Sequence, residues 1–212
     1  MSSDIRTVLS GHTIIPVVTL DRLEDAVPMA EALVAGGIPA IEMTLRTDAG
    51  LAAIEQIAKK VKGAIVGAGT ITKPAEVAAA KNAGAVFGVS PALFPDVIKA
   101  AAAARLPYMP GIMTATEAMQ ASALGCNVLK LFPAEPAGGL KLLKALAGPF
   151  PDLRFCPTGG IGPAQVADYL RQPNVIALGG SWLTPAEAMK TKDWATIRKL
   201  AAEAADLVRS TA

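Results

Sequence analysis

One lysine of this chain lies within an apolar run that has the character of a buried strand. Lys130 is the only charged residue of residues 128–132, and Pro133, which follows, cannot continue a central ladder. Removal of an ammonium from water favours the neutral amine, and a neutral amine at a strand end can attack a ketone. The sequence therefore predicts a nucleophilic lysine here. The alternative is an edge-strand lysine whose amine reaches solvent.

A carboxylate and a guanidinium could serve the same chemistry. Glu42 lies between Ile41 and Met43 in another strand-like run, so it should point inward, where a carboxylate is costly without a partner. Lys130 can be that partner. As a purely structural ion pair the two would stabilise little, whereas a general acid/base beside an amine nucleophile explains both burials. Arg46, four residues on, could hold a carboxylate or phosphate with its planar fork, or could be a solvated loop cation.

Two glycine pairs, each beside a hydroxyl residue, follow the last two predicted strands. They are Thr158-Gly159-Gly160 and Gly179-Gly180-Ser181. Glycine lets backbone N–H groups approach an oxyanion closely, and a helix that we expect to begin near Ser181 would add its positive N-terminal end. The pairs predict a phosphate site. The alternative is that they are merely tight turns between strand and helix.

The elements that must position these residues alternate regularly along the chain. Eight strand-like runs are expected at residues 14–19, 40–45, 64–68, 86–90, 108–112, 128–132, 154–158 and 175–178. Helical patterns separate them at residues 23–35, 49–60, 74–83, 94–104, 114–124, 140–147 and 163–170.

This alternation predicts an α/β fold, a (β/α)8 TIM barrel that forms a single domain over residues 1–212. A short N-terminal extension at 1–13 and a C-terminal helix at 194–209 complete it. A doubly wound open sheet is the competing fold, but no G-x-G-x-x-G follows the first strand. In a barrel, function collects at the carboxyl ends of the strands, which is where the residues above fall.

Charge and hydropathy limit the classes of partner that this protein could have. The net charge of +2 is too small for a nucleic-acid footprint, and no run of 18 or more apolar residues could span a bilayer. No signal-peptide pattern precedes the first strand, so we expect a cytoplasmic protein with a small-molecule partner. Cys126 and Cys156 make no metal or disulfide pattern and should be small core residues, and the sole histidine, His12, excludes a multi-histidine metal site.

Seven stretches together carry a family resemblance that covers nearly the whole chain. They read "IEMTLRT", "VGAGTI", "VSPAL", "MPGIMT", "LKLFPAE", "RFCPTGGIGP" and "LGGSWL". The chain resembles the 2-keto-3-deoxy-6-phosphogluconate (KDPG) aldolase family, the class I aldolases of the Entner–Doudoroff pathway, which also include 4-hydroxy-2-oxoglutarate (KHG) aldolases. The resemblance implies a homotrimer that needs neither a metal nor a cofactor and acts on a phosphorylated 2-keto acid.

The resemblance also implies a role for each site residue. Lys130 would form the Schiff base, and Glu42 would be the acid/base. The implied substrate-binding residues are Arg46 and Thr70 at the pyruvate carboxylate, Thr158, Gly159, Gly160 and Ser181 at the phosphate, and also Pro91, Phe132 and Gly180. Two features depart from some members of the family: residues 17–20 contain no arginine, and Ala92 replaces a glycine.

The implied reaction is cleavage of 2-dehydro-3-deoxy-6-phosphogluconate to pyruvate and glyceraldehyde 3-phosphate. Cleavage of 4-hydroxy-2-oxoglutarate to pyruvate and glyoxylate could accompany it. The alternatives are an aldolase for the galactonate epimer, a phosphosugar isomerase or epimerase without a covalent lysine, and a non-catalytic phosphometabolite-binding barrel. The apolar surroundings of Lys130 favour the covalent reaction over the last two.

Overall fold

The computed structural model describes residues 4–211 as an α/β fold whose paired strands are parallel. The strands are β1 Ile14–Val18, β2 Ala40–Thr44, β3 Ile65–Gly69, β4 Gly88–Val89, β5 Tyr108–Met109, β6 Gly111–Ile112, β7 Val128–Leu131, β8 Arg154–Pro157 and β9 Leu178–Gly180. Six of them form one ladder in the order β5-β4-β3-β2-β1-β9, and three form a second in the order β6-β7-β8. This confirms the α/β class with a parallel sheet.

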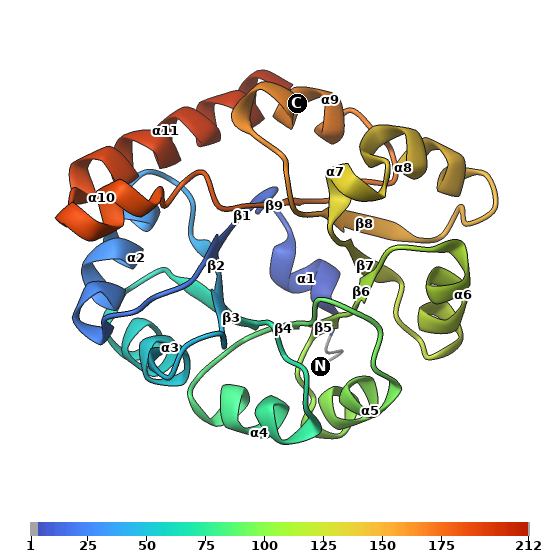
Figure 1. The fold of residues 1–212 in the computed structure, drawn as a ribbon, viewed down its shortest axis with the longest axis horizontal. Helices are drawn as coiled ribbons and strands as arrows, with labels where there is room; N and C mark the ends of the chain where they lie inside the picture. The colour runs from blue at the N-terminus through green and yellow to red at the C-terminus, as the bar shows by residue number, and fades with distance from the viewer. Residues whose placement is uncertain (1–3, 212) are drawn as a thin grey trace.

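The helices lie outside the strands, except for α1, which lies near the centre of the view (Figure 1). They are α1 Ile5–Leu9, α2 Ala26–Ala35, α3 Ala49–Lys60, α4 Pro74–Asn82, α5 Pro95–Ala104, α6 Ala115–Ala123, α7 Ala134–Ala137, α8 Gly139–Ala147, α9 Val166–Leu170, α10 Ala186–Thr191 and α11 Trp194–Thr211, with 3-10 turns η1 Leu23–Asp25 and η2 Pro163–Gln165. No helix among residues 4–211 is long and apolar enough to cross a membrane.

Local sequence explains why several helices begin where they do. Thr114 caps α6: its hydroxyl accepts from the Glu117 amide at 3.2 Å, while the Glu117 carboxylate accepts from the Thr114 amide at 2.8 Å. Helices α4 and α5 begin at Pro74 and Pro95, where a missing N–H costs nothing. These beginnings agree with the predicted ones to within one residue.

The strands are buried on both faces, and the hydrophobic core therefore consists of two clusters. The larger cluster packs strand residues against the surrounding helices, whereas a smaller cluster includes Ile5, Leu9, Phe87, Met109 and Cys156. Helix α1 supplies Ile5 and Leu9, and it lies among the strands near the centre of the view in Figure 1. Much of the predicted extension at 1–13 is therefore a helix that covers one end of the inner core, although residues 1–3 lie outside the described part.

Helices α2 and α11, from opposite ends of the chain, pack against each other. A Cβ built on Gly36, at the end of α2, would lie 2.5 Å from the Ala201 Cβ and 2.6 Å from the Arg198 carbonyl oxygen of α11. Only glycine lets the helices approach this closely. The predicted C-terminal helix at 194–209 is confirmed, and it continues to Thr211.

Two predicted strands differ from those observed. The run at 108–112 is divided into β5 and β6 at Pro110, which has no N–H to donate to a ladder. The run at 175–178 was placed too early, because β9 spans Leu178–Gly180. Before β9 the chain lies beside β8, where the Ile176 amide donates to the Phe155 carbonyl at 3.0 Å. The Leu178 amide then donates to Thr13 ahead of β1 at 2.8 Å.

Candidate active site

Strands β2 and β7 bring Glu42 and Lys130 together in the interior. The Lys130 amine donates to Glu42 Oε1 at 2.9 Å and to Oε2 at 3.2 Å. The side chain of Lys130 is 3% exposed and that of Glu42 is 2% exposed. The amine also lies 5.3 Å from the centroid of the Phe132 ring, within the range of a cation–π contact. The predicted partnership is therefore present, and solvent is excluded from it.

Glycine on the neighbouring strand makes room for the carboxylate. Glu42 is paired with Gly67 and Thr44 with Gly69 in the β2–β3 ladder. A Cβ built on Gly69 would lie 2.3 Å from Glu42 Oε1 and 2.5 Å from its Cγ. Any larger residue at position 69 would displace the carboxylate from the amine, which explains this glycine of the "VGAGTI" stretch.

The pair can supply a nucleophile and an acid from a single proton. Movement of one proton from the Lys130 ammonium to the Glu42 carboxylate yields a neutral amine and a carboxylic acid, while the net charge of the buried pair stays at zero. The amine can then attack an electrophilic carbon, and the acid can protonate a departing oxygen.

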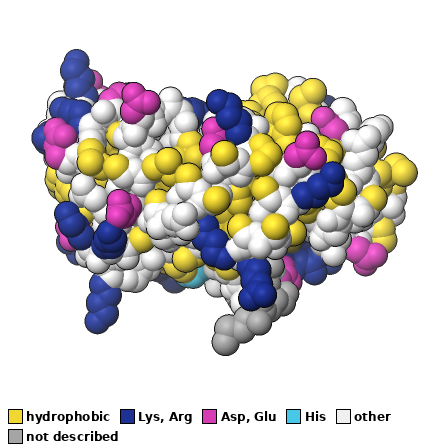
Figure 2. Space-filling model, turned by 90° about the horizontal axis from the view of Figure 1, so that it is seen from below, with side chains coloured by type: hydrophobic (Ala, Val, Ile, Leu, Met, Phe, Trp, Pro, Cys, Tyr) yellow, Lys and Arg dark blue, Asp and Glu magenta, His cyan; other side chains and the backbone are white. Residues whose placement is uncertain are grey.

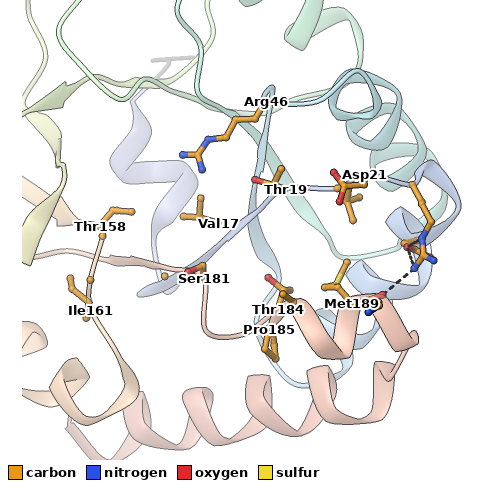
Figure 3. A pocket seen from close by; sticks show the side chains of 18 of the residues that line it. Val17, Thr19, Asp21, Arg46, Thr158, Ile161, Ser181, Thr184, Pro185 and Met189 are labelled. Carbon is orange, nitrogen blue, oxygen red and sulfur yellow. Dashed lines mark hydrogen bonds and ion pairs between the residues drawn. The ribbon is translucent and has the colours of Figure 1, made fainter.

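A cavity of about 880 Å³ opens where several of the strands end (Figure 3). It is lined by seven of the predicted site residues: Arg46, Phe132, Thr158, Gly159, Gly160, Gly180 and Ser181. Glu42, Lys130, Thr70 and Pro91 do not line it. Phe132 connects the two regions, because it lines the cavity and its ring lies beside the amine.

Arg46 and Thr70 meet at the ends of β2 and β3. Arg46 Nε donates to Thr70 Oγ1 at 3.1 Å, and the guanidinium points into the cavity (Figure 3). Thr70 has a φ of 60°, an unusual conformation for a threonine, and this backbone places its hydroxyl at the hydrogen bond. The bond to Nε orients the fork and leaves both terminal amino groups for an anion.

Pro91 packs against Gly111 of β6, the strand beside β7, which carries Lys130. A Cβ on Gly111 would lie 2.4 Å from the carbonyl carbon and oxygen of Pro91, and Gly111 is the ladder partner of Lys130. The adjacent Ser90, which is fully buried, accepts from the Gly111 amide at 3.3 Å. Pro91 therefore packs against β6, and the binding role implied for it stays a prediction.

The glycine turns after β8 adopt a backbone that other residues rarely reach. Gly159 and Gly160 have φ values of 104° and 81°. Thr158 forms an isolated bridge with Gly179, and a Cβ on Gly179 would lie 2.1 Å from Thr158 Oγ1. Glycine at 179 therefore permits β8 and β9 to approach, so that the Gly159-Gly160 turn and the end of β9 lie on one side of the cavity.

Two expectations about Gly180 and Ser181 were wrong. Gly179 and Gly180 are strand residues of β9, and no helix begins near Ser181, because α10 starts at Ala186. Pro185 explains the late start: the residue before a proline avoids the helical region, whereas proline itself suits a helix beginning. Any anion beside Ser181 is therefore bound without the N-terminal end of α10.

The cavity also contains residues that sequence reasoning missed. They are Asp21, Arg22, Asp25, Ile161, Thr184, Met189 and Lys190. Ile161 follows β8, and the others follow β1 or β9, which was a usable signal for a barrel, but charged residues in loops are common. Thr19 also lines the cavity, and its hydroxyl hydrogen-bonds that of the buried Thr44 at 2.8 Å.

The two thiols are not available as nucleophiles. Burial raises the pKa of Cys156 to about 12 and that of Cys126 to about 11, so both are neutral near pH 7. Cys156 is the ladder partner of Lys130, and its neutral thiol adds no charge beside the buried pair. Among residues 4–211 no group of three His, Cys, Asp or Glu side chains could hold a metal ion.

Comparison with known proteins identifies the family of this site. The family model "KDPG and KHG aldolase" matches residues 5–200. The chain belongs to this family. It is 48% identical over 200 residues to the KHG/KDPG aldolase of Escherichia coli K12, with 94% of each chain covered.

Solved structures of relatives agree with the fold. The KDPG aldolase of Zymomonas mobilis ZM4, solved with 3-phosphoglycerate, is 43% identical with a TM-score of 0.91, and 96% of each chain is covered. The enzyme of Legionella pneumophila, solved with pyruvate as a covalent carbinolamine, is 40% identical with a TM-score of 0.89 over 92% of this chain and 95% of that one. This protein is therefore an aldolase, and its site can be interpreted as that of a lyase.

Proposed function

We propose that this aldolase cleaves 2-dehydro-3-deoxy-6-phosphogluconate to pyruvate and glyceraldehyde 3-phosphate through a Schiff base on Lys130. The observation that carries the proposal is the buried Lys130 amine at 2.9 Å from Glu42 Oε1. An amine with a proton acceptor at this distance can become neutral and attack without solvent.

The covalent phase begins at the C2 carbonyl. The neutral amine of Lys130 attacks C2, and the resulting carbinolamine loses water when Glu42 protonates the departing hydroxyl. The product is an iminium, which withdraws electrons from the neighbouring C3–C4 bond. Glu42 is left as a carboxylate, in the state that the next step requires.

During cleavage and release, the Glu42 carboxylate first accepts a proton and then donates it. Glu42 accepts the proton of the C4 hydroxyl while the C3–C4 bond breaks, and the bonding electrons move to form an enamine. Glyceraldehyde 3-phosphate leaves, and Glu42 returns its proton to C3. Water then hydrolyses the iminium to pyruvate and regenerates the Lys130 amine.

The substrate extends from the buried amine to Gly159, Gly160 and Gly180. The Arg46 fork, oriented by Thr70, holds the carboxylate of the pyruvate portion, and the Phe132 ring packs beside the reacting carbons. The phosphate is bound at the other end. Backbone donors of Gly159, Gly160 and Gly180 and the hydroxyls of Thr158 and Ser181 serve that end, all from residues that line the cavity.

Cleavage of 4-hydroxy-2-oxoglutarate to pyruvate and glyoxylate is a second activity of the same site. Its support is the name of the relative from E. coli, which includes both substrates. The shorter substrate would form the same imine at Lys130 but would not use the phosphate end of the site.

The proposed barrel is a closed ring of eight strands in a single domain over residues 1–212. In this arrangement β5 and β6 are two parts of one strand: the Ser90 amide donates to Met109 at 3.3 Å, and the Lys130 amide donates to Pro110 at 2.9 Å. The bridges Phe155–Val175 and Thr158–Gly179 support closure at the β8–β9 junction.

The proposed assembly is a homotrimer in the cytoplasm. Its support is the apolar surface of the α5–α6 region, where hydrophobic side chains gather on the right-hand part of the face shown in Figure 2. Phe94, Met113, Met119 and Leu124 of this region are 39%, 48%, 62% and 38% exposed. A second copy of the chain would cover such side chains.

Borohydride reduction in the presence of pyruvate, followed by peptide mass mapping, tests the proposed mechanism. The reduced pyruvyl adduct is expected on Lys130 alone. An adduct on another lysine, or no adduct at all, would contradict the covalent role of Lys130.

A further inference from the structure

A second buried carboxylate lies at the outer end of the cavity. Asp25, the last residue of η1, has a side chain that is 5% exposed. Its Oδ2 accepts from Arg22 Nε at 2.8 Å and lies 2.7 Å from Arg22 Nη2. Its Oδ1 lies 3.7 Å from Lys192 Nζ and has no hydrogen-bond partner among residues 4–211. Burial of a carboxylate is costly, so this arrangement calls for a reason beyond the modest gain from an ion pair.

Arg22 and Lys192, the two cations beside Asp25, belong to two different segments of the chain. Arg22 follows β1, and its Nη2 also donates to the Met189 carbonyl of α10 at 3.1 Å. Lys192 is the C-cap of α10 and has a φ of 57°. The last carbonyls of a helix lack intrahelical partners, and cations near them are favourable. Asp25 thus joins the β1–α2 connection to the C-terminal end of α10.

Helix α10 has few other means of staying in place. It has only six residues, of which Ala188 alone is buried. A helix this short is not stable by itself and depends on tertiary contacts. Nevertheless, α10 forms one wall of the cavity through Ala186, Met189 and Lys190 (Figure 3).

We propose that Asp25 is a positioning residue for phosphorylated substrate. By fixing Arg22 and Lys192 it holds α10 against the cavity, and α10 in turn keeps Lys190 in the cavity lining. Lys190 has no ion-pair partner among residues 4–211, so its charge is available to a phosphate. The inference rests on the proposed function, because it concerns the phosphate end of that site.

Asp25→Asn is the direct test, because asparagine keeps the shape but removes the charge. The KM for the phosphorylated substrate should rise about tenfold, the size expected from loss of a charge-assisted interaction, while kcat stays within about a factor of two. The KM for 4-hydroxy-2-oxoglutarate should not change. The affinity for inorganic phosphate, measured as a competitive inhibitor, should fall in parallel with the affinity for the phosphorylated substrate. A merely structural role would alter both substrates together.

Two further variants keep the test decisive if Asp25→Asn folds poorly. Lys192→Asn removes one cation and retains a residue type that tolerates positive φ, so it should raise the same KM. Asp168→Asn is the matched control, because Asp168 forms an exposed ion pair with Arg171 at 3.3 Å on α9, away from the cavity. It should leave both KM values unchanged.

A double-mutant cycle tests whether Asp25 acts through Lys190. Lys190→Gln alone should raise the KM for the phosphorylated substrate, and adding Asp25→Asn should then have little further effect. Additive effects, or an unchanged KM in Asp25→Asn and Lys192→Asn, would overturn the positioning role. If the unsubstituted enzyme fails to cleave the phosphorylated substrate, the proposed function fails, and this inference with it.

Discussion

The Lys130 amine lies 2.9 Å from Oε1 of Glu42, although the two residues are 88 positions apart in the chain. Their strands are not neighbours in the sheet: Glu42 is on β2 of the six-stranded ladder and Lys130 on β7 of the three-stranded one. The contact is therefore made across the interior. Both charges are desolvated there, so each residue depends on the other, and variants of the two should fail in different ways.

Lys130→Arg should abolish cleavage and imine formation. A guanidinium stays protonated and cannot be the nucleophile, although it can still pair with Glu42. Turnover and borohydride trapping with pyruvate are the measurements. Lys144→Arg is the control, because Lys144 is exposed on α8 and should retain both properties. Trapping that survives Lys130→Arg would place the imine elsewhere.

Glu42→Gln should lower kcat by about 10²–10⁴ while pyruvate affinity and the thermal midpoint change little. Glutamine keeps the shape and the fit over Gly69 but cannot move protons. If the pair were only structural, removal of one buried partner would cost about 3–5 kcal/mol of stability. Single-turnover enamine formation, measured with the melting curve, separates these roles: a stable variant with near-native turnover would refute the catalytic role.

Ser181→Ala should raise the KM for the phosphorylated substrate and spare 4-hydroxy-2-oxoglutarate. Ser181 is exposed at the cavity and is not at a helix N-terminus, so its contribution is that of one hydroxyl beside backbone donors. We expect a rise of about 3- to 12-fold, as for loss of one hydrogen bond. Steady-state kinetics on both substrates check this, and equal losses on the two would argue against a phosphate contact.

Gly179→Ala should destabilise the protein by about 1–3 kcal/mol, because a Cβ at this position would lie 2.1 Å from Thr158 Oγ1. The junction of β8 and β9 would have to widen. Gly148→Ala is the matched control: nothing lies within 4 Å of its Cβ position, and its φ of −66° suits alanine. Denaturant unfolding should show a loss only for position 179, and equal stability of the two variants would contradict the close approach.

Stability should fall as the pH rises from about 9 to about 12. Burial raises the pKa of the Cys156 thiol to about 12 in the folded state, whereas the unfolded chain loses that proton near the ordinary pKa of 9.0. In this window the unfolded state binds fewer protons, so the free energy of unfolding decreases with pH. Cys156→Ala should show a shallower decrease in denaturant titrations at several pH values. An identical slope in both proteins would exclude this contribution.

Several features of the fold could be predicted from local sequence. Helix α3 spans the predicted residues 49–60, and the capping exchange between Thr114 and Glu117 is complete within four residues of chain. The Lys130 strand was recognisable because its lysine interrupts an apolar run. Such features depend on neighbours in the chain, so the sequence by itself determined them, together with the α/β class and the two charged groups of the site.

Tertiary structure alone decided how these parts meet. The β8–β9 junction requires glycine at 179 because of Thr158, which is remote in the chain, and this is why a pair expected to be a turn is a strand. Asp25 lay in a predicted helix with no sign that Lys192 would approach it. In both cases the energy comes from close packing or desolvated charge between distant segments, which no local pattern records.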